Sequence, residues 1–214
     1  MVRYNYGKGV FDLKTVRTAK LLSTPMETVT LDHMTNYTIV DMEYATENIS
    51  SNKTAQVPVN ISAEYYEKGK KMDQFNMWVM SPRVKDSNTI NTVKKCGIPL
   101  DILRSRNYND LFTKFSSWVL RDKIKRSPII SYGANTDVKT FNEQAKSLYH
   151  SSDEIVPIVL QDIERTISEM VNPGGVSLEN ISKLFNVDYK PNHIGIEDIH
   201  YINALIKAIR KARG

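Results

Sequence analysis

The first half of the chain has the hydrophobic pattern of β-strands. Residues 37–43 are rich in β-branched and aromatic side chains and predict a buried strand that ends in two carboxylates. Residues 57–66 and 72–80 predict two further strands, joined by a hairpin at residues 67–70 that contains a glycine. The polar residues 46–56 predict a loop. The sheet is therefore expected to begin with antiparallel strands.

Helical spacing appears in the second half, together with a short strand. Leu111, Phe115 and Trp118 recur on one face of a predicted helix. Residues 129–132 predict a short strand that Gly133 closes. The helix expected after it has the cap candidates Asn135 and Thr136 and an apolar face made of Val138, Phe141, Ala145 and Leu148.

Two more helices are expected near the C-terminus. Residues 172–175 read Asn-Pro-Gly-Gly and break the chain, after which Ser177 can cap a short helix that reaches Phe185. The last helix has one apolar stripe, and its basic C-terminal end suits the negative end of the helix dipole. Hairpin strands followed by alternating helices and strands predict a mixed α/β sheet covered by helices. The stripe consists of Ile199, Ile202, Leu205, Ile206 and Ile209.

Composition and length favour one folded domain with an appendage. The chain has 214 residues, of which 41% are hydrophobic and 25% charged, as in ordinary globular proteins. Residues 1–36 have no clear hydrophobic period and are interpreted as an N-terminal extension, and residues 37–214 as the domain. No window approaches the ~18–20 apolar residues of a membrane span, so a cytoplasmic protein without a membrane partner is expected.

The charge and the cysteine content narrow the function classes only slightly. A net charge of +5 and a pI near 9.1 permit binding to a polyanion. The basic charge supports nucleic-acid binding only if the chain also has a cluster of acidic residues that binds metal ions. Without metal ions, such a cluster would repel phosphates. The single cysteine, Cys96, excludes a disulfide framework within the chain and a multi-cysteine zinc site.

Two carboxylates at the end of the first strand are the first candidates for chemistry. Asp41 and Glu43 are two residues apart, so on a strand both point to the same face. Burying such a pair without compensation is costly, and a cation is its natural partner. Alternatively, one of the two carboxylates lies in the following loop and is solvated. When the pair is considered without the rest of the sequence, this second interpretation is the favoured one.

Three residues in the second half are further candidates. Asp137 follows a strand at the start of a helix and, seen alone, would be a helix cap. His193 and Asp198 are five residues apart and would lie on different faces of one continuous helix. With His193 in the preceding loop and Asp198 in the first turn of the last helix, both can reach one site.

Taken in order, these positions resemble the three motifs of the DEDDh exonucleases, the superfamily of ribonuclease T and of the polymerase proofreading subunit. Residues 40–43 carry the Asp-x-Glu motif, residues 131–138 the second aspartate, and residues 193–198 the His-x-x-x-x-Asp motif. Residues 95–98 and 115–118 resemble elements between the motifs. The resemblance covers about residues 37–214. Within the superfamily, the sequence is similar to the subgroup that contains histone-mRNA and small-RNA trimming exonucleases and KapD.

This resemblance implies a fold, an activity and a set of ligands. The fold would be ribonuclease H-like, a mixed sheet with three antiparallel strands followed by parallel ones. The activity would be 3′→5′ hydrolysis of single-stranded DNA or RNA with a free 3′-hydroxyl, aided by two Mg²⁺ or Mn²⁺ ions. Asp41, Glu43, Asp137 and Asp198 would hold these ions, and His193 would be the general base.

The resemblance also suggests residues that contact substrate. The main chain of Met42 and the ring of Tyr44 are candidates for contacting the terminal nucleotide, with Ala45 beside them, and Lys139 for contacting a phosphate. The family often has threonine or another small residue where Tyr44 stands, and often alanine where Gly195 stands. These two differences concern the fit of the 3′-terminal nucleotide.

Two other functions remain as alternatives. One is an inactive nucleic-acid-binding or scaffold protein with the same fold, which the presence of all five site residues disfavours. The other is a ribonuclease H-like endonuclease, which His193 disfavours. DNA and RNA both remain possible substrates, and the oligomeric state stays open.

Overall fold

The computed structural model describes a set of segments that together form one sheet with helices on both faces. They comprise residues 31, 34–50, 53–80, 91, 93–94, 98, 103, 106–134, 137, 140–141, 161–164, 167, 177–190 and 194–213. Among these residues, no helix is long and apolar enough to cross a membrane. The N-terminal extension falls mostly outside this set, so its boundary stays a prediction.

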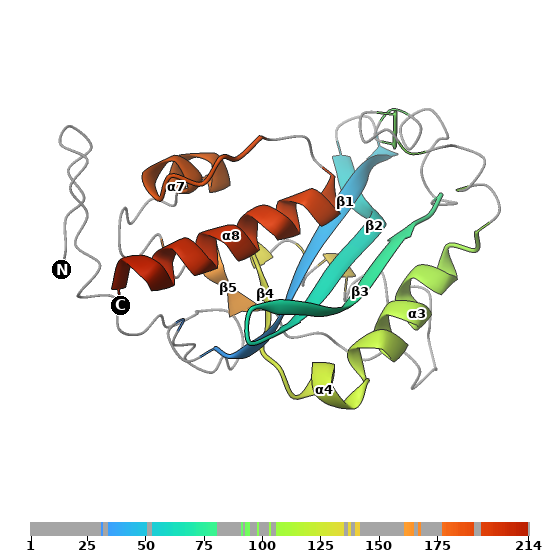
Figure 1. The fold of residues 1–214 in the computed structure, drawn as a ribbon. Helices are drawn as coiled ribbons and strands as arrows, with labels where there is room; N and C mark the ends of the chain where they lie inside the picture. The colour runs from blue at the N-terminus through green and yellow to red at the C-terminus, as the bar shows by residue number, and fades with distance from the viewer. Residues whose placement is uncertain are drawn as a thin grey trace.

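The sheet has five strands in the order β3-β2-β1-β4-β5 (Figure 1). The first three, β1 (Asn36–Ser50), β2 (Lys53–Glu67) and β3 (Lys70–Trp78), are antiparallel neighbours. The short strands β4 (Ile129–Ser131) and β5 (Gln161–Asp162) join β1 in parallel. The predicted mixed sheet, antiparallel first and then parallel, is confirmed.

The hairpin between β2 and β3 forms where the sequence predicts it. Its two turn residues, Lys68 and Gly69, both have positive φ angles, of 50° and 76°. Glycine adopts this conformation without steric cost, which explains why a glycine stands in a two-residue turn.

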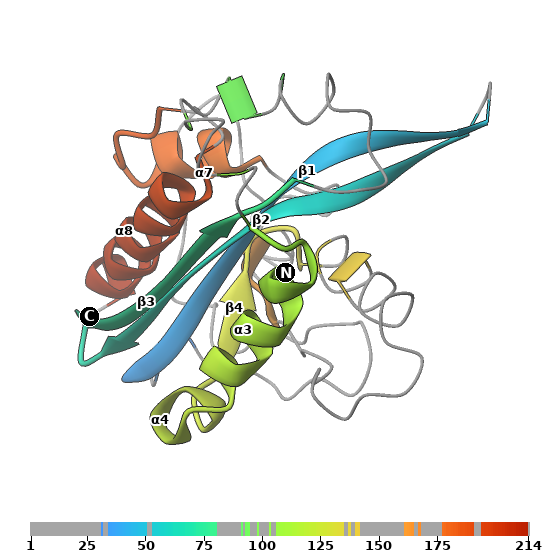
Figure 2. The same cartoon turned by 90° about the vertical axis from the view of Figure 1, so that its right-hand side faces the viewer.

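The prediction of a loop at residues 46–56 is wrong. β1 and β2 continue through this stretch as a paired ribbon that reaches Ser50 and Lys53, and Figure 2 shows it projecting beyond the other strands. Main-chain hydrogen bonds hold an antiparallel pair whatever the polarity of its side chains. The ribbon starts at a register shift between Glu43 and Tyr44, opposite Pro58, whose missing N–H suits an irregular position.

Helices cover both faces of the sheet. On one face lie α3 (Asn109–Val119) and the short α4 (Asp122–Lys125), and α8 (Gly195–Arg213) crosses β1 and β2 on the other (Figure 1). The helix α7 (Leu178–Leu184) packs against α8, and the Ser177 side chain caps it as predicted by accepting a hydrogen bond from the main chain. The helix expected after β4 is described only in part.

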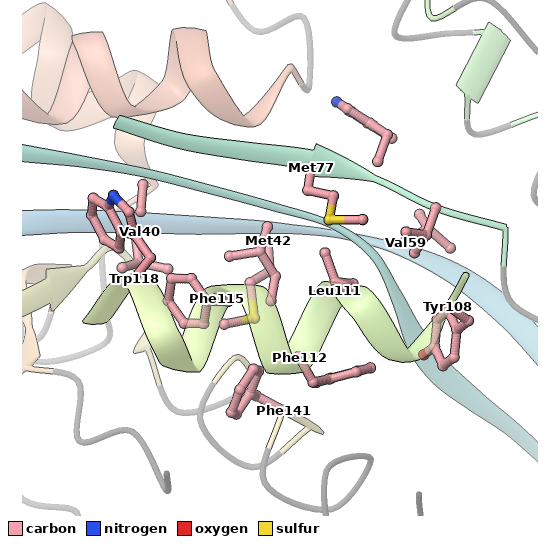
Figure 3. Packing of buried hydrophobic residues seen from close by; sticks show 14 of the residues in the cluster. Val40, Met42, Val59, Met77, Tyr108, Leu111, Phe112, Phe115, Trp118 and Phe141 are labelled. Carbon is pink, nitrogen blue, oxygen red and sulfur yellow. The ribbon is translucent and has the colours of Figure 1, made fainter. Parts of the chain in front are cut away.

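Two apolar clusters follow from this arrangement. The first lies between the sheet and α3, where Phe112, Phe115 and Trp118 pack on side chains of β1 and β2 (Figure 3). The second lies under α8, and the predicted stripe of that helix is fully buried in it. Leu31 and Met34 join the second cluster, and the guanidinium of Arg210 donates to both of their main-chain carbonyls.

The strand β2, which lies between β3 and the central strand β1, is buried on both faces, yet one face is polar. Four of its consecutive side chains toward α8 are polar and less than 4% exposed, and we call them the polar row. Their neighbours along the strand point toward α3 and are apolar or aromatic. The acids of β1 stand beside this row. It consists of Asn60, Ser62, Glu64 and Tyr66.

Candidate active site

Asp41 and Glu43 lie on the α8 side of β1. The strand register places Asp41 opposite Ser62 and Glu43 opposite Asn60, so both carboxylates share a face with the polar row. This confirms the predicted arrangement of the pair, because Glu43 lies within the strand rather than in a solvated loop. Both side chains are partly buried.

The helix α8 brings a third carboxylate to the pair. Asp198 lies in its first turn, as predicted, and is buried. One carboxylate oxygen from each of Asp41, Glu43 and Asp198 lies within 4.8 Å of the others. Three hard oxygen donors at this spacing fit a divalent cation such as Mg²⁺ or Mn²⁺.

The raised pKa values of the clustered acids also favour a bound cation. Burial, and then the charges of Glu43, Asp137 and Asp198, raise the pKa of Asp41 well above its usual value. Burial, followed by Asp198 and Asp137, raises the pKa of Glu43 to about 8. A bound divalent cation would reverse this effect, since an opposite charge favours the ionised form.

The fourth predicted acid, Asp137, is held by two hydroxyl groups. The Tyr44 hydroxyl donates to its Oδ1 at 2.5 Å, and the Ser131 hydroxyl donates to its Oδ2 at 3.0 Å. Burial raises the pKa of Asp137 to about 6, although these two hydrogen bonds lower it. Asp137 lies inside its helix, after Ala134, so it is not the capping residue that its sequence position alone suggests.

An acid that the sequence analysis missed supports Asp137. Oδ1 of Asp162, at the end of β5, accepts hydrogen bonds from the main-chain N–H groups of Gly133 (3.1 Å) and Glu164 (3.0 Å). Gly133 has a φ of 76° and begins the turn that leads from β4 into the helix of Asp137. The only signal in the sequence was an aspartate that follows a short apolar run.

Tyr189 is a second residue that the sequence analysis missed. Its side chain is hydrogen-bonded to Asp198, and burial together with the charges of Asp198 and Asp41 raises its pKa. Its ring stands edge-on against Tyr201 of α8, with centroids 4.7 Å apart. No sequence pattern links it to the motifs.

Gly195 lets the first turn of α8 approach the acids closely. A Cβ atom at this position would lie 2.9 Å from Oδ2 of Asp41 and 3.0 Å from the side-chain oxygens of Asn60 and Ser62. Such contacts are too short for an alanine without a shift of the helix or its neighbours. The glycine is therefore matched to Asn60 and Ser62, which are themselves hydrogen-bonded at 2.9 Å.

The predicted substrate contacts have different surroundings. The side chains of Met42 and Ala45 are buried in the cluster on the α3 side, so a nucleotide contact of these residues, which stays a prediction, would involve their main chain. The hydroxyl of Tyr44 is engaged by Asp137. His193 and Lys139 lie outside the described residues, so their roles stay predictions.

Solved 3′-exonucleases have a similar fold. The nuclease domain of 3′hExo, a DEDDh family member bound to rAMP, matches with a TM-score of 0.64 at 15% identity, over 85% of this chain and 93% of that chain. A 3′-exonuclease that recognises the histone mRNA stem-loop matches with a TM-score of 0.62 at 14% identity, over 84% of this chain and 65% of that one. The chain has the fold of the DEDDh exonucleases.

This fold extends to larger enzymes, of which the chain spans a smaller part. E. coli exonuclease I in complex with a dT13 oligonucleotide matches with a TM-score of 0.52 at 14% identity, over 84% of this chain and 41% of that one. No protein-family model matches the sequence, and no curated protein matches it. The likeness to the DEDDh exonucleases therefore rests on the fold.

Proposed function

We propose that the chain is a metal-dependent 3′→5′ exonuclease acting on single-stranded DNA or RNA. One observation carries this proposal: three carboxylate oxygens from two separate segments lie within 4.8 Å of one another on a DEDDh fold. The fourth acid, Asp137, lies close enough to raise the pKa of Asp41 and Glu43. Similar proteins bind rAMP or an oligonucleotide, which supports a nucleic-acid substrate.

Each acid has a proposed role that fits its surroundings. Asp41, Glu43 and Asp198 would hold one divalent cation, and Asp41 would also help to hold the second. Asp137 would help to hold the second cation mainly through water, since both of its oxygens already accept hydrogen bonds from hydroxyl groups. Two such cations, when bound, activate a water and stabilise charge on the leaving oxygen of the phosphodiester.

The proton transfer is assigned to His193. An imidazole with a pKa near neutrality can take the proton from the attacking water. The sequence places it just before α8, whose first turn carries Asp198. The positive net charge of +5 would attract the phosphates that precede the 3′-terminal nucleotide of the nucleic acid. Activity should therefore fall as the salt concentration rises.

The test uses a 5′-labelled single-stranded oligonucleotide of DNA or RNA with Mn²⁺ or Mg²⁺. We expect products shortened by single nucleotides from a 3′-hydroxyl end, inhibition by a 3′-phosphate, and no cutting of a circular strand. Asp198→Asn should remove hydrolysis, whereas Asp188→Asn, the same change at an exposed site, should not. His193→Ala should slow hydrolysis by roughly 10²–10⁴-fold.

The other outcomes identify the alternatives. Cutting of the circular strand would indicate an endonuclease. Tight binding without hydrolysis of any substrate would indicate an inactive nucleic-acid-binding protein and would end the exonuclease proposal.

A further inference from the structure

The four acids of the cluster are held in two different ways. Asp41 and Glu43 are fixed by β1, whose register with β2 sets the direction of both side chains. Asp137 and Asp198 instead come from helices, at the first turns that follow a loop or a short strand. Their orientation toward the pair on β1 needs additional contacts.

A tyrosine hydroxyl contacts each of the two helical aspartates. Tyr44 donates to Oδ1 of Asp137 at 2.5 Å and thereby links that helix to β1. Tyr189, in the segment before α8, is hydrogen-bonded to Asp198. At neutral pH a phenol carries its proton, so it donates to a carboxylate without adding charge to the cluster.

Both rings have fixed surroundings, which gives their hydroxyls a defined position. Tyr44 packs against the apolar cluster on the α3 side of the sheet. Tyr189 stands edge-on against Tyr201, which belongs to the same helix as Asp198, at an interplanar angle of 83°. An ionised carboxylate has about four acceptor sites, so even the two hydrogen bonds that Asp137 accepts leave room for a cation or its bound water.

We propose that Tyr44 and Tyr189 are positioning residues that orient Asp137 and Asp198 for divalent cations. The inference rests on the proposed function, because it treats these aspartates as groups that hold the cations, Asp198 directly and Asp137 mainly through water. Outer contacts of this kind typically change metal affinity or activity by about 10–100-fold. The larger effect is expected at Tyr189, since Asp198 belongs to the three closely spaced acids.

The chain offers a matched control at Tyr66. Its hydroxyl donates to Glu64, a buried carboxylate of the polar row. Oε1 of Glu64 also lies 3.0 Å from Nζ of Lys71 and 3.1 Å from the ring nitrogen Nε2 of His200, and is hydrogen-bonded to both. Tyr66→Phe removes the same atom from the same kind of hydrogen bond. Glu64 is not one of the clustered acids.

The experiment is a Mn²⁺ titration of the full chain without nucleic acid, followed by the electron-spin resonance signal of free Mn²⁺. We expect Tyr189→Phe and Tyr44→Phe to raise the Kd for Mn²⁺ by about 10–100-fold, and Tyr66→Phe to leave it unchanged. Thermal unfolding in chelator checks that each variant is folded. Wild-type affinity in both site variants, or an equal loss in Tyr66→Phe, would overturn the inference.

Hydrolysis assays separate this inference from the proposed function. In the two site variants, activity should recover at saturating Mn²⁺, because the half-saturating metal concentration changes more than kcat. If the wild-type chain binds Mn²⁺ but hydrolyses no nucleic acid, the exonuclease proposal fails while the titration still decides the role of the tyrosines.

Discussion

The two faces of β2 are both buried but are stabilised by different interactions. Toward α3, the strand contributes Val59, Ile61 and Ala63 to a cluster of apolar and aromatic side chains (Figure 3). Toward α8, the polar row is held by hydrogen bonds such as that from Ser62 to Asn60 at 2.9 Å. The apolar face is stabilised by non-directional burial, whereas the polar face depends on specific partners.

This difference separates stability from function within one strand. The acids of β1 point toward the polar face, where neighbouring amides and hydroxyls tolerate charge and hydration better than aliphatic side chains do. The opposite face can then provide most of the apolar burial. Changes to the clustered acids, or to Asn60 and Ser62 opposite them, should therefore affect metal binding and hydrolysis, and changes on the apolar face should affect folding.

The largest expected effect is loss of hydrolysis in Asp41→Asn. The substitution removes a cation ligand but little volume, so the fold should persist, and without metal its Tm should equal or exceed that of the wild type because one like charge is gone. Activity and thermal unfolding in chelator are the measurements. Asp122→Asn, at an exposed position of α4, is the control. Near-normal turnover in Asp41→Asn would contradict the two-metal site.

On the apolar face, Phe115→Ala should lower the free energy of unfolding by about 3–5 kcal/mol. Phe115 is fully buried and packs against Phe75, Trp118 and Phe141, with ring centroids 5.4–6.1 Å apart. Denaturant unfolding measures the loss. The activity per folded molecule at low temperature should stay close to wild type. A large drop in that specific activity without loss of stability would show that the two faces are not separable.

A smaller effect is expected for Gly195→Ala, which places a methyl group 2.9 Å from Asp41 Oδ2. Alanine usually favours a helix, but crowding here should cost about 1–3 kcal/mol and weaken metal binding. Adding Ser62→Ala removes one of the crowding oxygens and should restore part of the loss. Unfolding and Mn²⁺ titration of the single and double variants test this. A stabilised, fully active Gly195→Ala would refute the close approach.

The last expected effect is a dependence of metal-free stability on pH. The pKa of Glu43 is raised from 4.5 to about 8 and that of Asp137 from 3.8 to about 6. The folded chain thus keeps protons that the unfolded chain has lost, so stability should fall as pH rises through about 4–8. Phe115→Ala should keep this slope and Asp41→Asn should reduce it. The measurement is Tm as a function of pH, first in chelator and then with Mn²⁺. If the same slope appeared with and without Mn²⁺, the clustered acids would not be its cause.

The sequence predicted those parts of the fold that depend on apolar periodicity. The stripe of α8, the strand that ends at Asp41 and Glu43, and the Ser177 cap are all confirmed. Residues 46–56 were misread because polar composition was taken as a sign of a loop, although strand pairing there needs only the main chain.

The surroundings of the site were harder to predict, because they depend on contacts far apart in the chain. The hydrogen bond from Tyr44 to Asp137 spans 93 residues, and the contact of Gly195 with Asp41 and Ser62 joins α8 to two strands. Neither leaves a local pattern. Identifying Asp162 required knowing that β5 lies beside β4.

The ribbon of β1 and β2 has a consequence for behaviour at high concentration. Within the described part of the chain, β4 pairs with β1 only at Thr38 and Ile39, and β3 ends opposite Asn60, so both outer edges of the ribbon are open. Open edges can recruit a strand from another molecule and lead to aggregation. The polar composition of residues 46–56, which suggested a loop, is of the kind that disfavours such pairing between molecules.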